Sequence, residues 1–136
     1  MSLHMRDAEK FALSLPARSE NLITVRRAVS AFAASLGLEE QTIADLRLAV
    51  NEACSNVVRH AYEDADAGAM SVEALPIGDY LVVVVQDDGR GLSKASSDPG
   101  SGLGLRVASA VSNSFEVRQK SAGTEVRLAF PLGNGA

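Results

Sequence analysis

Apolar residues recur at steps of three and four positions between residues 43 and 61, which is the spacing of a helix with one apolar stripe. The stripe consists of Ile43, Leu46, Val50, Ala53, Val57 and Ala61. Glu52, Asn56 and His60 lie beside it, and because each is four residues from the next, all three share one face of the helix. We therefore predict a helix that begins after residues 39–40 and ends near residue 62, with one apolar and one polar face.

Two other segments have helical patterns. Residues 22–36 carry an apolar face; Ser19 or Asn21 is suited to cap this helix, and Gly37 is suited to end it in a left-handed conformation. A third helix is expected to begin at Gly102 and to run to about residue 111. The polar segment before it, residues 92–101, is expected to be a loop.

Five short segments have the composition of strands. Residues 10–15 alternate briefly and end at Pro16, which favours an edge strand. Residues 70–75 and 80–86 predict a hairpin with its turn at 76–79, and residues 115–119 and 124–130 predict a second hairpin with its turn at 121–123. Residues 81–85 are apolar without alternation, so we expect a central strand that is covered on both faces.

The predicted elements follow the order strand, helix, helix, strand, strand, loop, helix, strand, strand. Two hairpins with the helices grouped apart predict an α+β fold. We expect a two-layer sandwich in which one mixed, mostly antiparallel sheet is covered on one face by about three helices. A single domain is predicted over residues 6–132. Residues 1–5 are interpreted as an expression-vector remnant or a disordered N-terminus, and residues 133–136 as a frayed tail.

The composition narrows the classes of partner. The chain has 136 residues and is 46% apolar, so it can form a proper core. With 4% aromatic residues and a net charge of −4, direct binding of nucleic acid is not expected. We expect no membrane association and a cytoplasmic location, because the chain has neither a long apolar run nor a signal-peptide pattern. The single cysteine, Cys54, is expected to be a packed helix residue.

Three segments carry candidate chemistry. Asp87 ends the central strand beside glycines, where it can accept a hydrogen bond from an exocyclic amine such as that of adenine. Gly102 and Gly104 begin a helix whose free N–H groups can hold phosphates. Phosphates bring Mg²⁺, for which Asn56 offers an oxygen ligand, and Glu52 can orient or deprotonate a nucleophile.

Each of these segments also has a plain structural interpretation. The face formed by Glu52, Asn56 and His60 could be the solvated side of a surface helix. Asp87 could cap its own backbone in a turn, and the glycines at the start of the last helix could be a hinge. The occurrence of all three segments in one short chain favours a nucleotide site.

Four motifs follow one another in the chain. They are Glu-Ala-x-x-Asn-x-x-x-His-Ala-Tyr from residue 52, Asp-x-Gly-x-Gly from residue 87, Ser-Gly-Leu-Gly-Leu from residue 101 and Gly-Thr from residue 123. This order resembles the GHKL ATPase superfamily, which includes gyrase, MutL and the histidine kinases. Within it, the chain resembles the bacterial anti-sigma factor serine/threonine kinases. The resemblance covers nearly the whole chain and implies a Bergerat-type ATP-binding fold.

The resemblance implies a role for each matched residue. Glu52 corresponds to the catalytic base, and Asn56 to the residue that holds Mg²⁺ against the phosphates of ATP. Asp87 corresponds to the aspartate that reads adenine, in a pocket shaped by Gly89 and Gly91.

Further matches concern the phosphates and the last motif. The lid end and phosphate loop correspond to Ser101, Gly102, Leu103 and Gly104. Gly123 and Thr124 correspond to the last motif, in which the threonine hydroxyl supports the adenine aspartate. Arg59 lies where histidine kinases often carry a basic phosphate contact.

The same resemblance implies an activity and partners. The expected function is that of an anti-sigma factor and serine/threonine kinase that uses ATP and Mg²⁺, sequesters a sigma factor and phosphorylates an anti-sigma factor antagonist. A homodimer is expected. The alternative is a regulatory switch module that binds nucleotide and partner with little or no kinase activity. The short segment between Gly91 and Gly102, and Gly100 where related kinases often have arginine, favour that alternative.

Overall fold

A computed structural model describes residues 10–61, 68–89, 101–120 and 122–133, except for the side chains of residues 60–61 and 101–105. Its elements are β1 (Phe11–Pro16), the 3₁₀ helix η1 (Ser19–Asn21), α2 (Leu22–Ser35), α3 (Glu40–Asn56), the π-helical turn η2 (Val57–Ala61), β2 (Ala69–Ile77), β3 (Tyr80–Asp87), α5 (Ser101–Val111), β4 (Ser114–Gln119) and β5 (Thr124–Pro131). This is the predicted order of helices and strands. The predicted helix end near residue 62 and most of the predicted loop before α5 lie outside the described residues.

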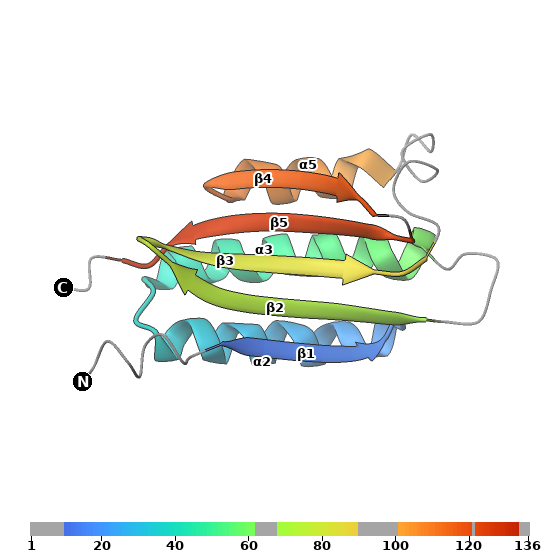
Figure 1. The fold of residues 1–136 in the computed structure, drawn as a ribbon. Helices are drawn as coiled ribbons and strands as arrows, with labels where there is room; N and C mark the ends of the chain where they lie inside the picture. The colour runs from blue at the N-terminus through green and yellow to red at the C-terminus, as the bar shows by residue number, and fades with distance from the viewer. Residues whose placement is uncertain (1–9, 62–67, 90–100, 121, 134–136) are drawn as a thin grey trace.

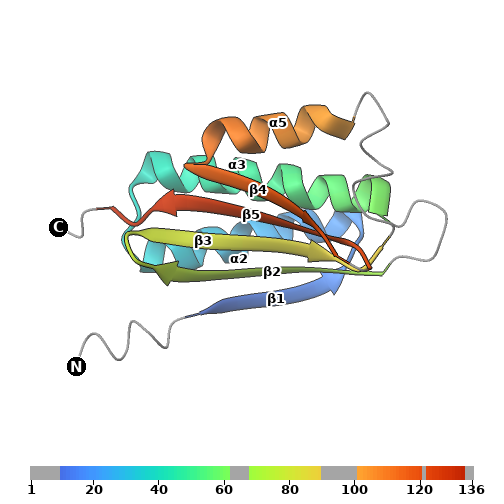
Figure 2. The same ribbon diagram turned by 45° about the horizontal axis from the view of Figure 1, so that its top comes forward.

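The five strands form one sheet in the order β1-β2-β3-β5-β4. Helices α2, α3 and α5 lie together on one face of this sheet, with α3 between the other two (Figures 1 and 2). The predicted α+β sandwich, with one face of the sheet covered by about three helices, is therefore confirmed.

The strand directions correct one detail of the prediction. We expected a mixed sheet, whereas all four neighbouring pairs are antiparallel. The reason is that β5 lies between β3 and β4, so the two strands that are connected through α5 are not hydrogen-bonded to each other.

The core lies between the sheet and the helices. In β5 the buried side chains alternate along the strand: Thr124, Val126, Leu128 and Phe130. In α3 the buried apolar side chains are Leu46, Ala49, Val50, Ala53 and Cys54. Burying a leucine or phenylalanine side chain of this kind contributes about 1.5–3 kcal/mol to stability, so this layer holds α3 firmly against the strands.

The central strand β3 was predicted to be covered on both faces, but only one of its faces is covered by helices (Figure 2). On the other face Val82 is half-buried. Val84 is nevertheless only 8% exposed, because it lies in register between Glu73 of β2 and Arg127 of β5, whose long side chains flank it. Neighbouring strands, rather than a second layer, therefore shield this face.

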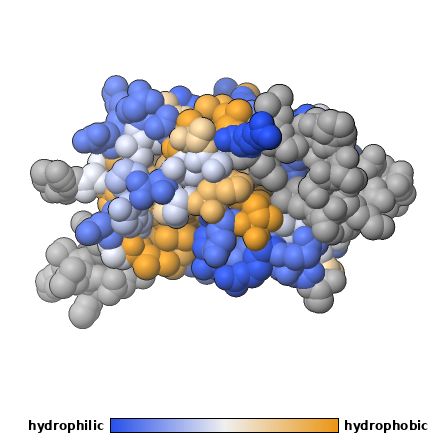
Figure 3. Space-filling model, turned by 90° about the horizontal axis from the view of Figure 1, so that it is seen from above, coloured by the Kyte–Doolittle hydropathy of each residue, from blue (hydrophilic) through white to orange (hydrophobic). Residues whose placement is uncertain are grey.

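The outer strand β4 is less well covered than the centre of the sheet. Figure 3 shows the side of the molecule that carries α5 and β4, where orange hydrophobic patches are interrupted by blue hydrophilic residues. Val117 of β4 is 40% exposed, because an edge strand has a neighbour in the sheet on one side only. Among the described helices, none is both long and apolar enough to cross a membrane.

Two glycines act where they were expected to act. Gly37 follows α2 with a φ of +86°, the left-handed conformation that ends many helices. The strands of the first hairpin extend further than predicted, so that only Gly78 and Asp79 form the turn. Gly78 has a φ of +60° at the first turn position, where a type II′ turn requires glycine.

The end of the central helix is wound differently from its body. Residues Val57–Ala61 form a π-helical turn after α3. Hydrogen bonds in a π turn span five residues instead of four, so residues beyond Asn56 are rotated relative to a regular helix. The predicted row of Glu52, Asn56 and His60 therefore holds for its first two members, while the His60 side chain lies outside the described part.

Candidate functional site

Burial of a polar side chain costs free energy unless its hydrogen bonds are satisfied, so buried polar side chains are candidates for a functional site. Among the described residues, three polar side chains are buried: Asn56 (5% exposed), Asp87 (6%) and Thr124 (2%). All three belong to the predicted nucleotide motifs. They come from the end of α3, the end of β3 and the start of β5, which lie at the same end of the molecule (Figures 1 and 2).

Asp87 is held by its neighbours in the sheet and by its own chain. It is the register partner of Thr124. The backbone N–H of Gly89 donates a hydrogen bond to its Oδ1 at 2.9 Å. This is the contact expected of an aspartate that caps its own turn.

The β4–β5 turn packs directly against Asp87. Gly123 has a φ of +92°, and a Cβ atom at this position would lie 1.8 Å from the backbone oxygen of Asp87. Only glycine fits such a close approach. The glycine of the last motif therefore fixes the position of the aspartate, and the threonine beside it fills the adjoining buried space.

The electrostatics of Asp87 reflect its burial. Burial is the largest effect and raises the pKa of its carboxyl group. The hydrogen bond from Gly89, the positive charge of Lys120 and a backbone hydrogen bond with Thr124 lower this pKa, while the charge of Asp88 raises it. Asp87 is thus a desolvated acceptor whose charge depends on a few specific neighbours.

Glu52 and Asn56 lie one turn apart on α3. Asn56 is buried and Glu52 is half-buried, so the carboxylate retains contact with solvent at the helix surface. Arg59 is exposed on the π-helical turn. Glu52 and Asn56 therefore share one face of α3, and the Glu52 carboxylate is accessible there.

The predicted phosphate loop forms the first turn of α5. Ser101, Gly102, Leu103 and Gly104 are helical, and the helix begins one residue before its predicted start. The first N–H groups of a helix have no partner within it and favour anions. Gly91 and most of the lid segment lie outside the described residues.

The donor set at this end suits Mg²⁺ bound mainly through phosphates. In the described part of the chain no group of three or more histidine, cysteine, aspartate or glutamate side chains could hold a metal ion. Mg²⁺ keeps several waters and needs one or two protein ligands when nucleotide phosphates are present. The side-chain oxygen of Asn56 fits this requirement.

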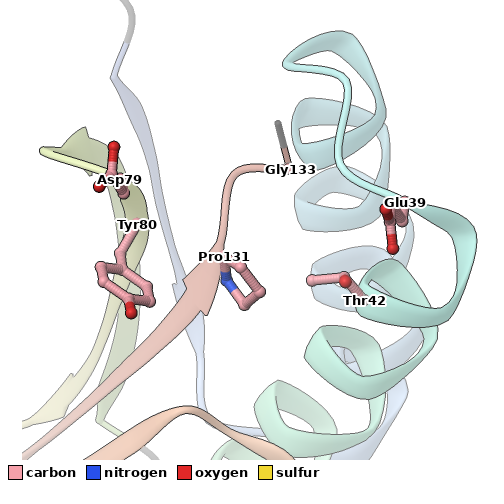
Figure 4. Close-up of a pocket in the computed structure, with 6 residues that line it drawn as sticks. All are labelled: Glu39, Thr42, Asp79, Tyr80, Pro131 and Gly133. Atoms are coloured by element: carbon pink, nitrogen blue, oxygen red, sulfur yellow. The ribbon is translucent and has the colours of Figure 1, made fainter. Parts of the chain in front are cut away.

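A cavity of about 450 Å³ lies at the opposite end of β3. It is lined by Glu39, Thr42, Asp79, Tyr80, Pro131 and Gly133. Figure 4 shows Glu39 and Thr42 on one side and Asp79 and Tyr80 on the other. Because its two acidic side chains would repel phosphates, we do not regard this cavity as the nucleotide site.

Cys54 has no part in the site. It is fully buried in α3, and burial raises the pKa of its thiol to about 12. A thiol with such a pKa stays protonated and unreactive at neutral pH. The prediction of a packed cysteine is confirmed.

One contact to the site was missed by sequence analysis. Lys120 in the β4–β5 turn reaches the end of β3, where its Nζ lies 3.2 Å from Oε1 of Gln86 and 3.4 Å from Oδ1 of Asp88. No local pattern indicates this contact, because it depends on the pairing of β3 with β5, more than thirty residues apart in the chain.

The model of one protein family matches most of the chain. The histidine kinase-like ATPase domain matches residues 15–130. The chain belongs to this family. Its resemblance to the superfamily of ATP-binding domains, inferred from four short motifs, is therefore confirmed.

Curated relatives carry a more specific name. Serine-protein kinase RsbW of Bacillus velezensis is 40% identical over 77 residues, which are 57% of this chain and 48% of that protein. RsbW of Listeria monocytogenes is 40% identical over 81 residues (60% and 52%), and RsbW of Bacillus subtilis is 35% identical over 83 residues (61% and 52%). The chain spans about half the length of the curated relatives it matches.

Solved structures show the same fold. The crystal structure of the RsbU and RsbW domains of a Mycobacterium tuberculosis protein matches with a TM-score of 0.72 at 24% identity and covers 90% of this chain and 32% of that chain. The histidine kinase AdeS of Acinetobacter baumannii matches with a TM-score of 0.55 at 12% identity and covers 97% of this chain and 73% of that chain. At these identities the likeness concerns the fold.

Proposed function

We propose that this chain binds ATP together with Mg²⁺ at the end of the molecule where α3, β3 and β5 end or begin. The observation that carries the proposal is the burial of Asn56, Asp87 and Thr124, the buried polar side chains of the described chain. Family membership supports it, because the family is named for an ATPase domain. An adenine amine would give the buried Asp87 carboxylate a further hydrogen-bond donor.

Each element would contribute to nucleotide binding in its own way. Asp87 would accept a hydrogen bond from adenine, supported by the Thr124 hydroxyl, with Gly89 and Gly91 shaping the pocket. The first turn of α5, residues 101–104, would hold phosphates through its free N–H groups. Asn56 would bind Mg²⁺, which when bound supplies positive charge to the phosphates, and Arg59 would add a further contact.

The proposed activity is that of a serine/threonine protein kinase. The name of the RsbW relatives and the position of Glu52 one turn from Asn56 support it. Glu52 would accept the proton of the target hydroxyl as the hydroxyl oxygen bonds to the γ-phosphorus. The bond from that phosphorus to the bridging oxygen breaks, and ADP leaves. The target would be a serine or threonine of an anti-sigma factor antagonist.

The proposed biological role is that of an anti-sigma factor in the cytoplasm. A homodimer would sequester a sigma factor and would release it when the antagonist binds in its place. The negative net charge of −4 argues against direct contact with nucleic acid. Binding of protein partners would then carry the regulatory effect.

A basic groove between α2 and α3 supports a role in partner binding. The groove is lined by Ile23, Arg26, Arg27, Ser30 and Arg47. Arg26 donates a hydrogen bond to Oδ1 of Asn51 at 3.0 Å, which ties α2 to α3. Ser30 is half-buried, and its Oγ atom is shielded from solvent without a hydrogen-bond partner among the described residues. Arg27 and Arg47 are exposed, and their guanidinium groups suit an acidic side chain of a partner protein.

A phosphate-transfer assay tests the kinase proposal. A purified anti-sigma factor antagonist would be incubated with radiolabelled ATP, Mg²⁺ and either wild-type protein or Glu52→Gln. We expect transfer by the wild type and a loss of about 10²–10⁴-fold in the variant, the usual contribution of a general base. Glu40→Gln, at the exposed start of the same helix, is the matched control and should retain activity. Nucleotide binding without transfer would support the regulatory switch module instead.

A further inference from the structure

Lys120 links the β4–β5 turn to the end of β3 on both sides of Asp87. Its Nζ contacts Oε1 of Gln86 at 3.2 Å and Oδ1 of Asp88 at 3.4 Å. These two residues flank Asp87 in the chain, so that one ammonium group bridges the side chains before and after the aspartate. The Lys120 side chain is 26% exposed, and solvent therefore screens its charge less than that of a free surface lysine.

The backbone of the turn is fixed at the same place. The N–H of Lys120 donates a hydrogen bond to the carbonyl oxygen of Gly123 at 3.0 Å. Gly123 in turn packs against the Asp87 backbone so closely that no side chain fits between them. The backbone from which the Lys120 side chain projects is thus anchored by a turn that itself touches Asp87.

We propose that Lys120 is a positioning residue of the nucleotide site, which fixes the end of β3 around Asp87 so that its carboxylate can meet the adenine amine. The inference rests on the proposed function, since it assigns Asp87 to adenine. Lys120 itself is not proposed to touch the nucleotide. It acts through the two residues beside Asp87 and through its charge.

The charge of Asp87 matters because an amine N–H group needs a hydrogen-bond acceptor. An ionised carboxylate only accepts hydrogen bonds, whereas a protonated one also presents a donor that conflicts with an N–H group. Among the described residues, the charged groups that act on Asp87 are Lys120, which lowers its pKa, and Asp88, which raises it. Loss of the Lys120 charge would leave burial and Asp88 to raise this pKa further.

The first test needs no nucleotide. The Asp87 carboxyl group would be titrated by carbon-13 NMR in the wild type, Lys120→Gln and Lys120→Arg. We expect Lys120→Gln to raise the midpoint by about half a pH unit, a modest value for a partly exposed charge, and Lys120→Arg to restore it. Lys10→Gln is the matched control, because Lys10 also pairs with a carboxylate, Glu73 at 3.9 Å. Equal midpoints in the wild type and Lys120→Gln would overturn the inference.

The second test measures ADP affinity over a pH range that spans the Asp87 midpoint found by the NMR titration. Below the midpoint, Lys120→Gln should bind about threefold more weakly than the wild type, which is what half a unit of pKa amounts to. Lys120→Arg should restore the wild-type profile. A uniform loss at every pH that arginine does not restore would show a merely structural role and contradict the inference. If the wild type binds neither ADP nor ATP with Mg²⁺, the proposed function fails, while the NMR titration still decides whether Lys120 controls the charge of Asp87.

Discussion

At the scale of single residues, burial of the Asp87 carboxyl group at the proposed nucleotide site lowers the stability of the folded protein at neutral pH. This residue is 6% exposed, and burial raises the pKa of its carboxyl group. Between its unfolded and folded pKa values the folded protein binds more protons than the unfolded chain, so stability falls as pH rises through the folded pKa. At neutral pH the charged Asp87 therefore costs folding free energy, which a ligand with an amine donor would recover.

The variant Asp87→Asn should separate binding from folding. The asparagine oxygen can still accept the hydrogen bond from Gly89, and the variant carries no buried charge. We expect its unfolding free energy at about pH 7 to equal or exceed that of the wild type, with this advantage shrinking as pH falls. Its affinity for ADP should fall at least about tenfold, because an amide presents a mismatched donor.

Chemical denaturation at two pH values and calorimetric titration with ADP measure the two effects. Wild-type affinity in Asp87→Asn would remove adenine recognition from this residue. A strong loss of stability at neutral pH would instead contradict our account of its charge.

At the scale of elements, the β4–β5 turn and the end of β3 behave as one unit. Gly123 touches the Asp87 backbone, and Thr124 is the register partner of Asp87. Lys120 contacts the two neighbours of Asp87 in the chain, Gln86 and Asp88. The last hairpin therefore does more than complete the sheet. Its turn fixes the position of Asp87 at the end of β3, beside the proposed nucleotide site.

Substitution of Gly123 by alanine should disturb this unit. The new Cβ would meet the Asp87 oxygen at 1.8 Å, so that either β3 or the turn has to move. Gly78→Ala is a matched control, because Gly78 also has a positive φ of +60° but faces open space. We expect Gly78→Ala to cost about 1–2 kcal/mol for its backbone conformation. Gly123→Ala should cost at least about 2 kcal/mol more and should weaken ADP binding. Equal losses in denaturant unfolding would contradict the close packing of this turn.

The elements themselves were largely predictable from the sequence. Periodicity indicated α3 because its buried side, from Leu46 to Ala53, repeats every three to four residues. Gly37 and Gly78 marked the ends of a helix and a strand, since both adopt conformations that other residues avoid. These features depend on local physics and are therefore visible without a structure.

Features that depend on distant contacts were not predictable. The position of β5 between β3 and β4 follows from packing of the whole sheet, and a mixed sheet was wrongly expected. The π-helical turn at Val57–Ala61 has no distinct composition. For the site, motif order indicated Asn56, Asp87 and Thr124 as candidates, and all three are buried. The contact of Lys120 was not predictable, because it arises only when β3 pairs with β5.

At the scale of the whole molecule, the two proposed tasks use different surfaces. The buried polar residues lie at the end formed by the last turn of α3 and the β3 exit. The basic groove lies along α2 and α3. Asn51, which receives a hydrogen bond from Arg26 of the groove, directly precedes Glu52. One helix thus carries residues of both surfaces.

The groove predicts that partner binding depends on charge. The double variant Arg27→Ala/Arg47→Ala removes two exposed guanidinium groups that have no carboxylate partner within the described part of the chain. We expect it to bind the sigma factor of the same genome about three- to tenfold more weakly and with less dependence on salt. Arg118→Ala, an exposed arginine on β4, is the control and should bind as the wild type does. Biolayer interferometry at two salt concentrations measures this, and unchanged affinity and salt dependence would exclude the groove as the docking surface.

Calorimetric titration of the purified protein with ATP, with and without Mg²⁺, tests the central claim most directly, with Asn56→Ala as the variant. Our account predicts that ATP binds, that Mg²⁺ tightens binding in the wild type, and that Asn56→Ala loses most of this effect of Mg²⁺. No binding of ATP under either condition would contradict the account, as would a Mg²⁺ effect of the same size in Asn56→Ala.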